Sequence, residues 1–148
     1  MTHEYFMQLA VQEAQKAKAS GNWPFGAVVV HDGIVVGSGY AIDKTLGDVT
    51  DHAEIRALRM ACKNLQSNNL SNCIIYCSNE PCLMCAASIF QANISSVIIG
   101  ASRDDLSRLL RLRKLKIEDL AEDSGRKIHI VRGTLKDQVL SLFIDIHK

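Results

Sequence analysis

Apolar positions recur with two different spacings along this chain. In residues 4–19 the apolar side chains lie three and four positions apart, from Phe6 to Ala17, which predicts an amphipathic helix. Residues 25–30 and 34–40 are instead continuous apolar runs rich in β-branched side chains, which favour strands. His31-Asp32-Gly33 separates these runs, and an Asp-Gly step is a strong hairpin signal. We therefore expect a helix followed by a two-stranded hairpin.

The rest of the chain alternates between the same two patterns. After a loop at 41–51, we predict helices at 52–66, 82–93 and 135–146, and strands at 73–77, 97–101 and 128–131. Strands that alternate with helices imply a mixed sheet covered by helices on both faces. The expected fold class is therefore α/β, a three-layer α-β-α sandwich around a mixed five-stranded sheet. No linker, repeat or low-complexity segment interrupts the pattern, so we expect a single domain over residues 1–148.

Composition limits the classes of partner. A formal net charge of +1 and an aromatic content of 5% give neither a global attraction to nucleic acid nor a large surface for stacking bases. No run approaches the length of a membrane span and no apolar signal-peptide core is visible, so no membrane partner is expected. The five cysteines are an odd number, and we expect those outside any metal site to be reduced in the core. A cytoplasmic location follows from that expectation.

Two short motifs carry the candidate chemistry, His52-Ala53-Glu54 and Pro81-Cys82-Leu83-Met84-Cys85. Each lies at the start of a predicted helix, the first capped by Thr50 or Asp51. One imidazole and two thiolates would hold Zn²⁺ and leave one tetrahedral corner for water, as catalytic zinc sites do. Glu54 is two residues from His52 and would address that water as a general base.

Each motif also has an ordinary explanation. A His-x-Glu triplet alone is usually a surface helix start, and a Cys-x-x-Cys pair is also found as a redox pair or as core filling. The conjunction of the two motifs, in this order and with a strand-like segment between them, favours a zinc site held by His52, Cys82 and Cys85.

The motifs also carry a family resemblance. Together with residues 24–30 and the stretch Asp48-x-Thr50-x-His52-Ala53-Glu54, they resemble the cytidine deaminase superfamily, in the branch of guanine deaminases and tRNA adenosine deaminases. The likeness is strong over residues 5–101. It implies a cytidine deaminase-like fold, Zn²⁺ as cofactor, Glu54 as the catalytic residue and a homodimer.

The resemblance also implies a set of substrate-contacting positions: Phe25, Ala41, Ala53, Glu80 and Asp105. Ordinary roles compete here as well, because a Phe at a strand start is often core and an acidic residue after a strand is often a helix cap. The chain departs from the family at three positions: many relatives have Asn where Ala41 stands, Pro at Val49, and, among tRNA deaminases, Leu at Asn79. A lost polar contact changes which substrate a pocket accepts.

Three functions are compatible with these patterns. The first is hydrolytic deamination of a nucleobase, a guanine-like purine or a related free base or nucleoside, which Pro24-Phe25-Gly26-Ala27 favours by resemblance. The second is deamination of adenosine to inosine in a tRNA anticodon loop. The third is a zinc module without catalysis, which the presence of Glu54 disfavours.

Residues 103–120 are the least family-like part of the chain, and residues 108–116 within them are strongly basic. Between Asp105 and Glu118 there are five basic residues and no acidic one: Arg108, Arg111, Arg113, Lys114 and Lys116. This composition fits a surface that contacts phosphate or RNA. It also fits an amphipathic, solvated element, and we favour that interpretation. Its buried side would be formed by five leucines: Leu106, Leu109, Leu110, Leu112 and Leu115.

Overall fold

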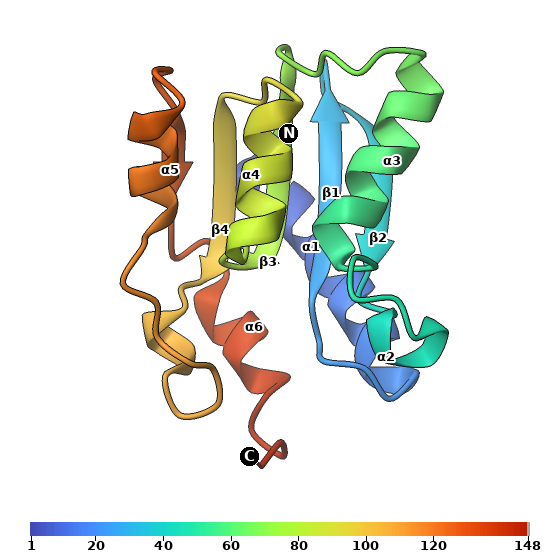
Figure 1. Cartoon of the computed structure of the whole chain (residues 1–148). Helices are drawn as coiled ribbons and strands as arrows, with labels where there is room; N and C mark the ends of the chain where they lie inside the picture. The colour runs from blue at the N-terminus through green and yellow to red at the C-terminus, as the bar shows by residue number, and fades with distance from the viewer. Residues whose placement is uncertain (148) are drawn as a thin grey trace.

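A computed structural model of the protein describes residues 1–147, in which five strands form one mixed sheet with helices on both faces (Figure 1). The strand order is β2-β1-β3-β4-β5. β1 is antiparallel to β2 and β3, while β3, β4 and β5 are mutually parallel. The strand bounds are β1 Gly26–His31, β2 Ile34–Tyr40, β3 Cys73–Asn79, β4 Ser96–Ala101 and β5 His129–Val131. The predicted mixed five-stranded α/β sandwich is confirmed.

Helices pack on the two faces of this sheet. The bounds are α1 His3–Ala19, α2 Asp43–Leu46, α3 Ala53–Leu65, α4 Leu83–Gln91, α5 Ile117–Asp123 and α6 Lys136–Ser141. α3 and α4 lie side by side on the front face in Figure 1, and α1 lies behind the sheet. Successive side chains of β1 point to opposite faces of the sheet. Ala27 and Val29 therefore pack on the α3 side, and Val28 and Val30 pack on the α1 side.

The hairpin forms as its sequence predicts. Asp32 and Gly33 both have positive φ, 48° and 75°, as a tight hairpin turn between β1 and β2 requires. At Gly39 in β2 a β-carbon would lie 2.6 Å from the carbonyl oxygen of Ala53. Glycine therefore lets the first turn of α3 approach the sheet closely, and this approach fixes the residues on either side of Ala53.

Several local expectations were wrong. The short helix α2 lies within the expected loop 41–51, and the last helix ends at Ser141, before the predicted 146. The cap of α3 is His52 itself, with no side-chain bond. Thr50 instead donates its hydroxyl hydrogen to Asp48, and the Asp51 carboxylate accepts from Arg56 and Arg59.

The basic stretch 108–116 is not an amphipathic helix. It follows a single 3₁₀ turn, Asp104–Leu106, and runs irregularly to the start of α5. Leu106 and Leu109 are buried, whereas Leu112 and Leu115 are each 53% exposed, so the leucines do not form one buried side. A coil has no fixed periodicity, and the leucine spacing therefore did not decide which side chains are covered.

The three cysteines outside the metal group lie in the core or against it. Cys73 and Cys77 are buried, Cys62 is partly buried, and none of the five is in a disulfide within residues 1–147. Among the helices of that described range, none is both long enough and apolar enough to cross a bilayer.

Candidate active site

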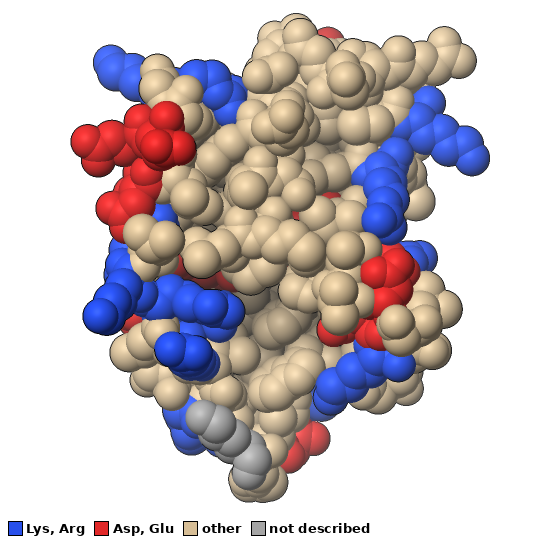
Figure 2. Space-filling view, in the orientation of Figure 1, with Lys and Arg blue, Asp and Glu red and all other residues tan. Residues whose placement is uncertain are grey.

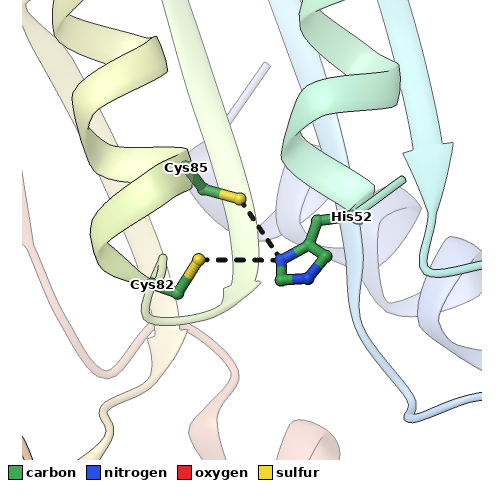
Figure 3. Close-up of side chains that lie close together, drawn as sticks. All are labelled: His52, Cys82 and Cys85. Atoms are coloured by element: carbon green, nitrogen blue, oxygen red, sulfur yellow. Dashed lines mark hydrogen bonds between the residues drawn. The ribbon is translucent and has the colours of Figure 1, made fainter. Parts of the chain in front are cut away.

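The starts of α3 and α4 bring three metal-binding side chains together. His52 immediately precedes α3 and Cys82 immediately precedes α4, with Cys85 in the first turn of α4. The Nδ1 atom of His52 lies 3.6 Å from the Sγ atom of Cys82 and 3.5 Å from that of Cys85 (Figure 3). The three ligand atoms all lie within 4.8 Å of one another. The two halves of the predicted motif therefore meet in space.

The local sequence explains this placement. β3 runs directly into Glu80 and Pro81, and the Glu80 N–H is held by the carbonyl of Ala101 on the neighbouring strand. Pro81 has no N–H to lose before the helix, and its fixed φ directs the chain into α4. Cys82 and Cys85, three positions apart, then lie on one side of the helix start.

The distances fit a tetrahedral zinc ion. Zinc–nitrogen and zinc–sulfur bonds of about 2.0 and 2.3 Å at a tetrahedral angle give a nitrogen–sulfur distance of about 3.5 Å. The observed distances between His52 and the two cysteines are 3.5 and 3.6 Å. An imidazole with two thiolates is a donor set that Zn²⁺ prefers, and its formal charge balances that of the ion.

The two thiols are electrostatically unequal. Hydrogen bonds from Cys85 and then from His52 lower the pKa of Cys82 to about 4, although burial opposes this. The hydrogen bond between the two thiols raises the pKa of Cys85, and burial is the second cause. The hydrogen bond with Cys82 also raises the pKa of His52. A coordinated metal would take the place of the protons that these groups share.

Glu54 is buried beside this group. Only 5% of the residue is exposed, and burial raises the pKa of its carboxyl to about 7, while a hydrogen bond with Cys85 acts in the opposite direction. Glu54 does not belong to the three-residue metal group of the described chain. A carboxyl group whose pKa lies near neutrality can both accept and release a proton, as general acid–base catalysis requires.

A cavity of about 180 Å³ opens beside these residues. Its lining consists of Phe25, His52, Glu54, Asn79, Glu80, Cys82, Arg103, Leu110 and Arg113. This volume is below the range of about 300–1,000 Å³ that is typical of pockets for drug-sized ligands. The cavity thus suits a small planar group placed next to the metal position.

A family model for the cytidine and deoxycytidylate deaminase zinc-binding region matches residues 1–101. The chain belongs to this family. It is a zinc-dependent hydrolytic deaminase, because the matched region includes both motifs and the His52, Cys82 and Cys85 group fits Zn²⁺.

Similar proteins support the same assignment. A tRNA-specific adenosine deaminase of Buchnera aphidicola subsp. Schizaphis graminum is 34% identical over 129 residues, covering 87% of this deaminase and 85% of that protein. A guanine deaminase of Bacillus subtilis is 42% identical over 106 residues, covering 71% and 68%. A structure solved in a study of A-to-I editing by tRNA:A34 deaminases matches with a TM-score of 0.81 and 31% identity, covering 93% and 98%. The expected cytidine deaminase-like fold is thus confirmed.

The deaminase brings only part of the predicted substrate-contacting set to the cavity. Phe25 and Glu80 line it. Ala53 is fully buried against Gly39, and Ala41 is buried with its N–H bonded to the carbonyl of Phe25. The Asp105 carboxylate accepts from the N–H of Ser102, in the turn that follows β4, and is not among the cavity-lining residues. Ala53, Ala41 and Asp105 are therefore not among the residues that line the cavity.

Four other lining residues of the deaminase were not predicted: Asn79, Arg103, Leu110 and Arg113. Asn79 is 4% exposed, and its side-chain oxygen accepts from Ser78, whose hydroxyl in turn accepts from the Gly26 N–H. These bonds fix the orientation of the Asn79 amide at the end of β3. Two sequence features could have indicated that these residues line the cavity. Asn79 directly precedes Glu80, and Arg113 belongs to the basic stretch 108–116.

Proposed function

We propose that this deaminase hydrolytically removes an exocyclic amino group from a nucleobase, with His52, Cys82 and Cys85 as the zinc ligands. The observation that carries the proposal is the meeting of these three side chains with buried Glu54 at one small cavity. Zinc, when bound, supplies Lewis acidity that makes water a nucleophile near neutral pH.

Glu54 is proposed to move the protons of the reaction. Its carboxylate accepts a proton from the attacking water, and its carboxyl group then donates to the ring nitrogen next to the attacked carbon. The same oxygens then carry the remaining proton of the added hydroxyl group to the departing amine, which leaves as ammonia while the ring gains a carbonyl. The burial of Glu54 supports this role, because bulk water cannot compete for its proton.

The first substrate candidate is a guanine-like purine, as a free base or nucleoside. The small volume of the cavity supports a flat base as the group that enters it. The similarity to the guanine deaminase of Bacillus subtilis supports a purine. Phe25 is proposed to pack against the base and Glu80 to contact its edge, since both line the cavity. Contacts from Ala41, Ala53 and Asp105 stay predictions from the resemblance.

The second candidate is adenosine in a tRNA anticodon loop. Two observations favour it: Arg103 and Arg113 line the cavity, and the tRNA-specific adenosine deaminase of Buchnera aphidicola matches 87% of the chain. A polynucleotide would require cationic side chains outside the base pocket.

Ammonia release separates the two candidates. The purified zinc-loaded protein is incubated with free bases and with nucleosides, and in parallel inosine formation is measured in an anticodon stem-loop. Release of ammonia from guanine or a related base supports the first candidate, and inosine formation in RNA alone supports the second. If neither panel yields a product, the proposed function is contradicted.

A homodimer and a cytoplasmic location are also proposed. A groove of about 510 Å³ between α3 and α4 lies apart from the metal group. Apolar side chains, including Ile55 and Leu58, contribute to its lining and support a subunit contact there. Sedimentation of the wild type tests the dimer.

The absence of disulfides within residues 1–147 supports a reducing compartment.

A further inference from the structure

The stretch 107–116 is anchored so that part of its positive charge faces the active-site cavity. Leu106 and Leu109 bury its first turns in the core. The Arg108 guanidinium donates to the carbonyls of Phe143 and Ile146, so this arginine ties the stretch to the C-terminal segment. Figure 2 shows Lys and Arg side chains gathered on the side of this face where Figure 1 draws the stretch, beside a hollowed part of the surface.

Two arginines of this region line the cavity itself. Arg103 and Arg113 share its wall with His52, Glu54 and Cys82. The Nε of Arg103 donates to the carbonyl of Arg111, which holds its side chain in place and leaves the other N–H groups of the guanidinium for a further partner.

The nearby carboxylates are paired with other cations. Glu80 and Glu118 both accept from Arg132, at 2.8 and 2.7 Å, and Asp104 lies 3.6 Å from Lys116. Among the ion pairs of residues 1–147, none includes Arg103 or Arg113. Partial burial, followed by the charge of Arg113, lowers the pKa of Arg103, although the charges of Cys82 and Glu80 act in the opposite direction.

The zinc site does not require these cations. Two thiolates and a neutral imidazole balance the charge of Zn²⁺, so the two guanidinium groups are not needed to neutralise the metal ligands. The cavity of about 180 Å³ admits little beyond a base, so any substituent on that base must lie at the mouth. An anionic substituent there would meet two guanidinium groups, the partly buried one of Arg103 and the exposed one of Arg113.

We propose that Arg103 and Arg113 form a phosphate subsite at the mouth of the active site, so that the preferred substrate is a base carrying a nearby phosphate. The inference rests on the proposed function, whose cavity receives the base. Guanidinium groups suit this role because their planar N–H forks bind phosphate oxygens in pairs. The phosphate belongs either to a nucleoside monophosphate or to the backbone of an RNA, and the two sources share this chemistry.

The test compares matched substrates with and without phosphate. kcat/KM is measured for nucleosides, their 5′-monophosphates and short RNA stem-loops, with the wild type, Arg103→Gln/Arg113→Gln and Lys114→Gln. Lys114 is the matched control, because it is an exposed cation of the same stretch outside the cavity lining. We expect a preference of about tenfold or more for a phosphate-bearing form, reduced to near one in the double variant and retained in the control.

The readout is the ratio of phosphate-bearing to phosphate-free rates, because a general loss of folding or catalysis changes both. Equal use of both forms by the wild type overturns the proposal, and so does an equal slowing of both forms in the double variant. The monophosphate and stem-loop arms identify the source of the phosphate.

A binding measurement keeps the proposal testable without turnover. Trp23, the single tryptophan of the chain, stacks at 6.1 Å on Phe25 of the cavity wall, so its fluorescence reports occupancy. Tighter binding of monophosphates than of nucleosides, lost in the double variant, supports the subsite even if no ammonia is released. Ammonia release without a phosphate preference in either assay supports the proposed function and overturns the subsite.

Discussion

The Nδ1 atom of His52 lies 3.5 Å from the Sγ atom of Cys85, across 33 positions of sequence. The same nitrogen also faces Cys82, so Nδ1 is the atom placed to bind zinc.

This geometry predicts an asymmetry between two acidic replacements. An Asp carboxylate places its oxygens at the position of Nδ1, whereas a Glu carboxylate places them one bond farther, near Nε2. We therefore expect His52→Asp to retain more zinc than His52→Glu, with both below the wild type. Elemental analysis of purified protein measures this, and greater retention by His52→Glu would indicate that Nε2 is the ligand.

Gly39 controls the distance between β2 and the start of α3. Gly39→Ala places a β-carbon 2.6 Å from the Ala53 carbonyl, which lies between His52 and Glu54. We expect the free energy of unfolding to fall by about 1–3 kcal/mol and the specific activity to fall as well. Urea unfolding and ammonia release provide the two measurements. Ser38→Ala, on the same strand, is the control, and an unchanged midpoint for Gly39→Ala would disprove the close packing.

The Glu118–Arg132 pair predicts a pH-dependent contribution to stability. The hydrogen bond from Arg132 is the largest cause of the lowered pKa of Glu118, whose ordinary value is 4.5. A carboxylate with a lowered folded pKa stabilises the protein above its ordinary pKa, and this contribution disappears as the pH falls through the lowered value. Because the Glu118 side chain is 53% exposed, the contribution at pH 7 is about 1 kcal/mol or less.

The comparison of Glu118→Gln with the wild type measures this contribution. The urea midpoint of the variant is expected to be lower at pH 7 and equal to that of the wild type in acid, where Glu118 is protonated. Glu122→Gln is the matched control, because Glu122 lies on the same helix and belongs to none of the ion pairs among residues 1–147. A midpoint difference that persists in acid would indicate a packing effect instead.

The sequence predicted the metal group better than it predicted the substrate pocket. His52, Cys82 and Cys85 are attached to helix starts, where the backbone is regular and a spacing of three defines a shared side. The continuous β-branched run at residues 25–30 likewise predicted a strand buried on both faces, and Val28 and Val29 do face opposite layers. Both predictions depend on regular backbone geometry, which a residue spacing encodes directly.

The pocket lining depends on irregular backbone. Arg103, Leu110 and Arg113 reach the cavity from a coil, where no period decides the direction of a side chain. The same reason explains why Leu112 is exposed although Leu109 is buried. The capping of α3 could not be predicted either, because Asp51 pairs with Arg56 and Arg59 instead of with the helix N–H groups.

The central claim is that Glu54 acts on water beside a zinc ion that other residues hold. The most direct measurement is bound zinc and ammonia release on the same preparations of wild type and Glu54→Gln. The account predicts about one zinc per chain in both proteins, with kcat lowered by about 10²–10⁴-fold in the variant. A wild type without stoichiometric zinc, or a Glu54→Gln protein with undiminished turnover, would contradict it.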